Sequence, residues 1–156
     1  LGQQGRVAGH RQDQRVARFA QTRVQPGERS GDTYDRVRHD AVAEWSPHLD
    51  IIGHPSGRLI SGREGYDVDL EAVLKGARRL GRVLELNSYY DRLDLNEFYL
   101  KKAKELGVSI SLGTDTHSSG GLQMMRFGVG IARRAWLEKK DILNCLSLGQ
   151  LQKRLK

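Results

Sequence analysis

The stretch that decides the fold is DVDLEAVLKGARRLGRVLELN, residues 67–87. Its first part, 67–81, has the spacing of apolar residues that is typical of an amphipathic helix. It ends in Gly81, the residue type that helices favour at a left-handed C-terminal cap. The second part, 82–87, is a short apolar run of the kind that forms a buried strand. A helix that leads directly into a strand is typical of proteins in which the two elements alternate.

The same unit recurs on both sides of this stretch. LDIIGH (49–54) and VSISLGT (108–114) are two further expected strands, and DLNEFYLKKAKELG (94–107) is a second expected helix that ends in glycine. Strands that alternate with helices of this length pair in parallel through right-handed crossovers. We therefore predict an α/β fold, either an open doubly wound sheet or part of a (β/α) barrel. A last helix is expected over 138–155.

Composition narrows the class of protein. The chain has 156 residues, about the size of one domain, and a formal net charge of +7, which favours a polyanionic or phosphorylated partner. Its single cysteine, Cys145, excludes an internal disulfide and any zinc site built from several cysteines. The sequence has no run of about 18 apolar residues and no hydrophobic signal segment, so we expect a cytoplasmic protein without a membrane partner.

Residues 1–45 differ in character from the rest of the chain. The first 40 residues contain eight arginines and six glutamines but no lysine, and their apolar residues are sparse. We expect a poorly ordered leader that contributes no strand to the sheet and forms at most a marginal helix near 16–21. A nucleic-acid-binding arm is the alternative interpretation. The folded domain is expected to cover 46–156.

Polar residues stand at the end of each predicted strand. His54 ends the first strand, Glu85 and Asn87 end the second, and Asp115 and His117 follow the third. In parallel α/β proteins the carboxyl ends of the strands meet at one rim, and chemistry gathers there. We therefore expect these side chains to lie along the same edge of the sheet.

Each of these residues also has an ordinary structural explanation. His54 can be a packing residue, Asp115 can cap a turn or a helix, and Glu85 is most simply a buried partner and not a ligand. Two imidazoles and a carboxylate at neighbouring strand ends nevertheless suit a divalent transition metal. The apolar residues Met124, Met125 and Phe127 are expected in the core.

Three stretches together carry a resemblance to a known family. DIIGHPSGRLI, LELNSYYDRLDLNEFYLKKAKELGV and GTDTHSSGGLQMMRFGVGIARR resemble the C-terminal third of the PHP (polymerase and histidinol phosphatase) domain. They are most similar to the version fused to bacterial family X DNA polymerases. The resemblance extends from about residue 46 to the end of the chain. It implies a section of a distorted (β/α)7 barrel with a cluster of metal ions at the C-terminal rim.

The resemblance also implies a chemistry and a set of site residues. Members of this branch are manganese-dependent 3′ to 5′ exonucleases that act on DNA 3′ ends in repair, so Mn²⁺ is the expected metal, with Zn²⁺ or Fe²⁺ as alternatives. His54, Asp115 and His117 match metal ligands, and the last two are the expected catalytic pair. Phosphate or substrate contacts are expected for three polar side chains on the strand-end loops: Arg58, Asn87 and Arg92. Tyr89 and Tyr90 offer stacking surfaces for a base, or pack within the loop.

Part of the family pattern is missing from the sequence. The His-x-His strand end and the next Asp, His, Glu and His ligands of the family have no matching motif, and residues 1–45 contain no His-x-His. Two explanations stay open: a truncated gene with an unrelated or frame-shifted leader, or part of a longer chain. Two functional alternatives also stay open. One is a stand-alone histidinol-phosphatase-like phosphoesterase, and the other is an inactive nucleic-acid-binding remnant.

Overall fold

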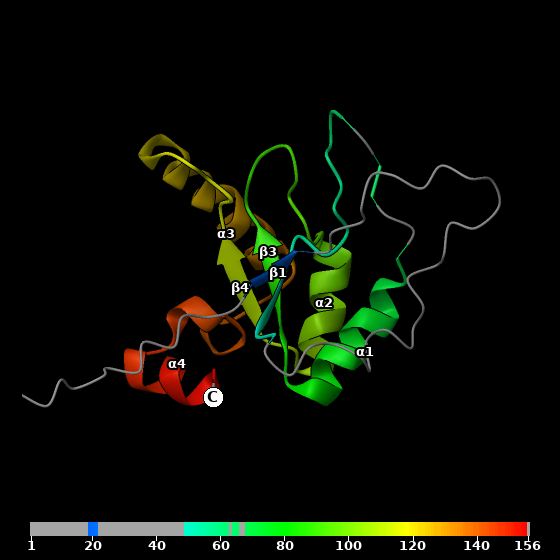
Figure 1. Ribbon diagram of the computed structural model, residues 1–156, viewed down its shortest axis with the longest axis vertical. Helices are drawn as coiled ribbons and strands as arrows, with labels where there is room; N and C mark the ends of the chain where they lie inside the picture. Colours follow the sequence, from blue (N-terminus) through cyan, green and yellow to red (C-terminus); the bar gives the residue numbers. More distant parts are fainter. Residues whose placement is uncertain (1–18, 22–48, 63, 66–67, 156) are drawn as a thin grey trace, which may run out of the picture.

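The protein is built around a parallel sheet with helices packed against it (Figure 1). The computed structural model describes residues 19–21, 49–62, 64–65 and 68–155. Its strands are β1 (Phe19–Gln21), β2 (Ile51–Gly53), β3 (Val83–Asn87) and β4 (Ile110–Gly113), in the spatial order β1-β2-β3-β4 and all parallel. The predicted α/β fold with parallel strands is confirmed.

The two predicted connecting helices are present and end at the predicted glycines, but each begins three residues after the start of its predicted range. Helix α1 (Leu70–Leu80) begins after Asp69, whose side chain accepts a hydrogen bond from the Ala72 amide. Helix α2 (Glu97–Leu106) begins after Asn96 in the same way. Both helices end at glycines with left-handed backbone, Gly81 with φ 64° and Gly107 with φ 69°, a conformation that glycine adopts without steric penalty.

The leader differs from expectation at one point. Phe19–Gln21 forms strand β1 and pairs in parallel with β2, in a register that places Phe19 opposite Ile51. The prediction that the leader contributes no strand, and at most a helix near 16–21, is therefore wrong for these three residues. The physical reason is that the edge of β2 presents a row of backbone donors and acceptors, to which the backbone of a short segment can bind. The rest of 1–45 lies outside the described residues.

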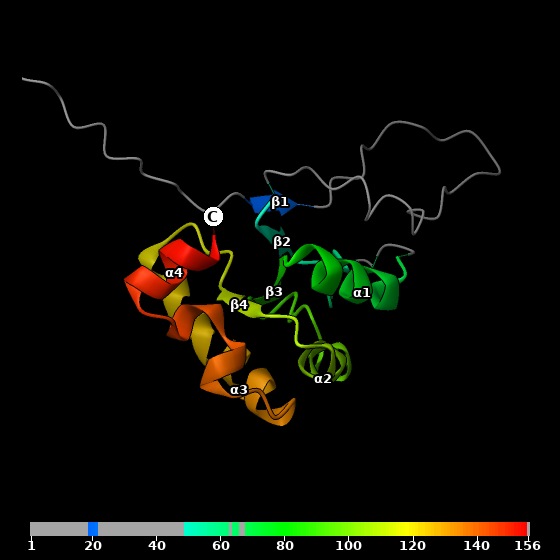
Figure 2. The ribbon, with the colours of Figure 1, turned by 90° about the horizontal axis from the view of Figure 1, so that it is seen from below.

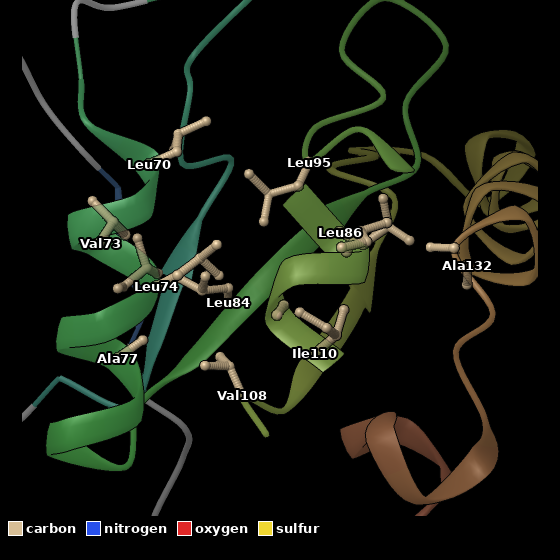
Figure 3. Packing of buried hydrophobic residues seen from close by; sticks show 14 of the residues in the cluster. Leu70, Val73, Leu74, Ala77, Leu84, Leu86, Leu95, Val108, Ile110 and Ala132 are labelled. Carbon is tan, nitrogen blue, oxygen red and sulfur yellow. The ribbon is translucent and has the colours of Figure 1, made fainter. Parts of the chain in front are cut away.

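Strand alternation divides the apolar residues between the two faces of the sheet. Leu84 and Leu86 point toward α1 and α2 and form the main core with apolar residues of these helices (Figure 3). Val83 points the other way and packs with Ile51 and Leu143. Figure 2 accordingly shows α1 and α2 on one side of the sheet and α4 (Leu148–Arg154) on the other. Glu85 and Asn87 share the face of Val83 because they lie two and four residues further along β3.

The chain after β4 contains more irregular structure than the sequence predicts. A 3-10 segment, η2 (Ser119–Met124), leads into helix α3 (Met125–Arg134). The sequence pattern assigned no element to this region, in which η2 and α3 contain two glycines each. The helix expected over 138–155 is wrong: two short 3-10 turns, η3 (Lys139–Asp141) and η4 (Leu143–Cys145), precede α4. None of the helices in the described ranges is long and apolar enough to span a membrane.

Residues 142–145 are not part of a continuous helix because they form hydrogen bonds with the edge of the sheet at β4. Ile142 is extended and forms a parallel bridge to Ile110. The Asn144 side chain accepts a hydrogen bond from the Leu112 amide at 2.8 Å and donates one to the Leu112 carbonyl at 3.1 Å. A side-chain amide thus takes the place of a neighbouring strand at Leu112. Ser147 then starts α4, with its side chain capping the Gln150 amide.

Helix α3 packs through small residues. Its buried residues are Gly128 and Ala132, whereas Phe127, expected in the core, is 37% exposed. Met125 packs against the core but is only partly buried. A Cβ atom at Gly128 would lie 1.9 Å from Ser88 Oγ, so the glycine allows α3 to lie directly on the loop that follows β3.

Gly128→Ala is expected to lower the free energy of unfolding by about 1–3 kcal/mol, because the added methyl group must displace the buried Ser88 side chain. Gly130→Ala in the same helix is the matched control. Its Cβ would have no neighbour within 4 Å, so the higher helix propensity of alanine should stabilise the chain by up to about 1 kcal/mol. Urea denaturation of both variants measures the difference. Equal effects would show that the contact with Ser88 does not limit how closely α3 packs.

Candidate functional site

The carboxyl ends of the parallel strands form one rim that carries the expected residues. His54 follows β2 directly, Asn87 ends β3, and Asp115 lies two residues beyond the end of β4. His54 and Asp115 both adopt a left-handed backbone, with φ 27° and φ 50°. Such conformations are strained for residues with a side chain and persist where the surrounding structure enforces them, often at functional sites. The rim is therefore the candidate site.

Asp115 and His117 line a cavity of about 540 Å³ at this rim, together with Arg92 from the loop after β3. Arg92 Nε donates to Asp115 Oδ2 at 3.1 Å, and the two side chains are 18% and 26% exposed. Arg92 Nη1 is buried and has no hydrogen-bond partner in the described part of the chain. A buried donor without a partner is rare in native structures, so the Arg92 guanidinium has hydrogen-bonding capacity that the described residues do not use.

His54 lies at the same rim but does not line this cavity. Its backbone amide donates to Glu85 Oε2 at 2.6 Å, and its side chain is buried. Within the described residues, Nδ1 of His54 has no hydrogen-bond partner, and no group of three or more His, Cys, Asp or Glu side chains is arranged to hold a metal ion. The donor types fit a transition metal, and the metal role of His54, Asp115 and His117 stays a prediction.

Glu85 is the buried partner that the sequence indicates. Its carboxylate accepts a hydrogen bond from the His54 amide. It also lies against Gly113, where a Cβ atom would come within 2.3 Å of Glu85 Oε1. Burial raises the pKa of the Glu85 carboxyl above its ordinary value, and this effect outweighs the opposing hydrogen bond from His54. Glu85 thus connects the ends of β2 and β4 from its place on β3.

Two residues expected to contact substrate are also part of the framework of the loops. The Asn87 side chain is fully buried, and its Oδ1 accepts from the Tyr89 amide at 3.0 Å. Arg58 Nε donates to the Arg92 carbonyl at 2.8 Å, and its Nη2 donates to the Leu93 carbonyl. Because these donors and acceptors are already used, the contacts favour a positioning role for both residues. A phosphate contact by Arg58 stays a prediction.

Asp94 is a site residue that the sequence reasoning missed. It is almost completely buried, and its Oδ2 accepts hydrogen bonds from the amides of Ser56 at 2.9 Å and Gly57 at 3.1 Å. Arg58 and Asp94, which we call the loop clamp, therefore tie the loops after β2 and β3 together in both directions. Opposite charges in two successive strand-end loops are the signal that would have indicated this pair.

Comparison with known proteins supports the resemblance. The chain is 44% identical over 109 residues to the DNA polymerase/3′-5′ exonuclease PolX of Bacillus subtilis (strain 168), a match that covers 70% of this chain and 19% of that protein. It is 32% identical over 117 residues to a probable phosphatase of Thermoanaerobacter sp. (strain X514), covering 71% and 45% of the two chains. No protein-family model matches the chain.

The parallel α/β fold places polar residues at the carboxyl rim, where such folds bind ligands. The similarity to both relatives supports a phosphoesterase-type domain. These similarities support the resemblance to the PHP domain of bacterial family X DNA polymerases that the three sequence stretches carry. The chain spans about a fifth of the length of the polymerase relative and just under half of the probable phosphatase, at 19% and 45%.

Proposed function

We propose that this chain is part of a metal-dependent phosphoesterase that removes nucleotides from the 3′ ends of DNA during repair. The observation that carries the proposal is the cavity at the strand ends, in which Asp115, His117 and Arg92 meet. The carboxylate and the imidazole can bind a divalent ion that contacts a phosphate, and the guanidinium can bind a phosphate oxygen directly. The 44% identity to a DNA polymerase/3′-5′ exonuclease favours DNA as the substrate class.

His54, Asp115 and His117 are the residues that would hold a divalent ion, with Mn²⁺ as the first candidate and Zn²⁺ or Fe²⁺ as alternatives. When bound, such an ion lowers the pKa of coordinated water and neutralises charge on the reacting phosphate. Three protein donors hold an ion less firmly than a complete cluster. We therefore expect the 156-residue chain to bind one ion weakly and to turn over little substrate by itself.

Arg92 is the residue proposed to bind the phosphate. Its Nη1 is buried without a partner among the residues described, while its Nε is used by Asp115. One guanidinium can therefore orient the carboxylate and still donate to a phosphate oxygen. The loop clamp holds the backbone that follows the Arg92 side chain, because Arg58 donates to the carbonyls of Arg92 and Leu93.

The test is a hybrid protein in which residues 49–155 of this chain replace the matching segment of the Bacillus subtilis relative. We expect the hybrid to release nucleotides from a single-stranded 3′ end when Mn²⁺ is present. His117→Ala in the hybrid should reduce that release by more than the roughly 10- to 100-fold loss that is typical of outer-sphere partners. Glu105→Gln, on the exposed end of α2, is the control and should leave release unchanged.

A parallel assay with histidinol phosphate and other small phosphomonoesters decides between the two enzyme classes. The similarity to probable phosphatases favours such substrates as the second candidate. A hybrid that hydrolyses small phosphomonoesters but leaves the DNA end intact would replace the exonuclease proposal with this one. Robust turnover by the unmodified chain, abolished by His54→Ala, would contradict the expectation of weak activity.

A further inference from the structure

The loop after β3 presents two tyrosines beside the cavity. Tyr89 is partly buried and lines the cavity next to Arg92. Tyr90 is 51% exposed, and its ring centroid lies 4.8 Å from that of Tyr89 at an interplanar angle of 31°. Burying an aromatic ring is favourable, so a ring that remains half exposed on top of another ring offers a flat apolar surface to a ligand.

The backbone that carries these rings is held from several directions. The amides of Arg92 and Leu93 donate to the Tyr89 carbonyl at 2.9 Å and 3.0 Å, which closes a tight turn. The Ile60 amide donates to the Asp91 carbonyl at 2.6 Å, and the loop clamp ties the same turn to the loop after β2. A surface that is already ordered loses little conformational freedom when a ligand binds.

The cavity beside the rings has the size and polarity of a ligand site. Its volume of about 540 Å³ lies within the range of about 300–1,000 Å³ that is usual for small-molecule pockets. Its lining includes one aromatic side chain, Tyr89, and one cationic side chain, Arg92, beside the carboxylates of Asp91 and Asp115. Proteins that bind single-stranded nucleic acid without reading its sequence stack the bases on aromatic side chains such as these.

We propose that Tyr90, supported by Tyr89, is a stacking surface for a nucleobase of the strand whose phosphate enters the cavity. Its function is to select single-stranded nucleic acid over small phosphoesters, which offer a phosphate but no base. The inference rests on the proposed function because both use the same cavity. It requires no metal ion, so it is tested separately.

The experiment measures binding of a thymidine tetranucleotide to the full chain in EDTA, together with tetranucleotides that carry an abasic residue at one position. Tyr90→Ala should weaken binding of the intact tetranucleotide by about 5- to 150-fold, the range that corresponds to stacking of one base on an aromatic ring. Tyr90→Phe keeps the ring and should bind within about twofold of the wild type. Phe98→Ala, which removes an aromatic side chain on α2 that is 56% exposed, should have no effect.

The abasic ligands show whether Tyr90→Ala weakens binding by removing base stacking or by changing the loop. For the wild type, one abasic position should weaken binding by about as much as Tyr90→Ala does. For Tyr90→Ala, the same ligand should bind no more weakly than the intact one, because the two changes remove the same contact. Thermal denaturation of each variant confirms that this surface substitution leaves the fold intact.

Three results would overturn the inference. One is equal binding of intact and abasic tetranucleotides by the wild type, and a second is binding by Tyr90→Ala that matches the wild type. Undetectable binding of the tetranucleotide at millimolar concentration would also overturn it. None of these results decides whether the hybrid protein hydrolyses a DNA end, which is measured with Mn²⁺. Conversely, base-dependent binding by a chain whose hybrid is inactive would establish the stacking surface and contradict the exonuclease proposal.

Discussion

Asp115→Asn is expected to reduce the affinity of the chain for Mn²⁺ by more than about 100-fold, the upper end of what a lost outer-sphere partner costs. Asparagine keeps the shape of the side chain but removes the negative charge that a hard divalent ion requires. The left-handed backbone at Asp115 tolerates this change, because asparagine is among the residues that adopt that conformation most readily. Electron paramagnetic resonance of free Mn²⁺ during a titration measures the change.

Asp91→Asn is the matched control for this experiment, because Asp91 lines the same cavity but was not expected to be a ligand. It should change the affinity only a few-fold, as expected for a charge separated from the ion by solvent. The stability of Asp115→Asn should fall by no more than about 1 kcal/mol, since the ion pair with Arg92 is partly exposed. Similar losses of Mn²⁺ affinity in both variants would show that the cavity attracts the ion only through its overall charge.

Asp94→Ala is expected to lower the free energy of unfolding by about 2–4 kcal/mol. It removes the acceptor of the Ser56 and Gly57 amides, and each buried donor left without a partner costs about 1–3 kcal/mol. Asp94→Asn should be much milder, because its side-chain oxygen can take the place of Oδ2 in both hydrogen bonds. Urea denaturation at neutral pH compares the two variants. Equal losses would mean that the charge, and not the acceptor, holds the loops together.

The same residue predicts a pH dependence with a definite sign. Burial raises the pKa of the Asp94 carboxyl in the folded chain above its ordinary value, although the contacts with Ser56, Gly57 and Arg58 oppose the shift. The folded state therefore holds its proton to higher pH than the unfolded state. This contribution to stability is present below the unfolded pKa and is lost as pH rises through the folded pKa. In Asp94→Asn this decrease should be absent, so the stability difference between the variant and the wild type should change across the same interval.

The sequence predicts the regular part of the fold because local signals and burial agree there. Asp69 and Gly81 delimit α1, and the alternation of Val83, Leu84 and Leu86 sets the two faces of β3. The same periodicity places His54, Asn87 and Asp115 at one rim, since parallel strands end on the same side. The sequence pattern therefore predicts where the backbone of the site residues lies.

The side chains at the rim contact residues that are distant in sequence, and a local sequence pattern does not predict such contacts. Arg58 is a plausible phosphate ligand by residue type, yet its guanidinium binds carbonyls 34 and 35 residues further along the chain. Asp94 has a charge that would place it at the surface, but two amides from another loop stabilise it in the interior. The break in the last predicted helix has the same origin, because Asn144 pairs with Leu112 and not with its own neighbours.

The pairing of Asn144 with Leu112 also bears on self-assembly. An open sheet edge is a template to which strands of other molecules add, and aggregation often begins there. At the β4 edge the Asn144 amide already fills both backbone positions of Leu112, and Ile142 pairs with Ile110. A second molecule would have to displace these contacts before it could extend the sheet. Growth of ordered aggregates from this edge is therefore disfavoured by Asn144 together with Ile142, and Asn144 is a position to preserve when the chain is redesigned for solubility.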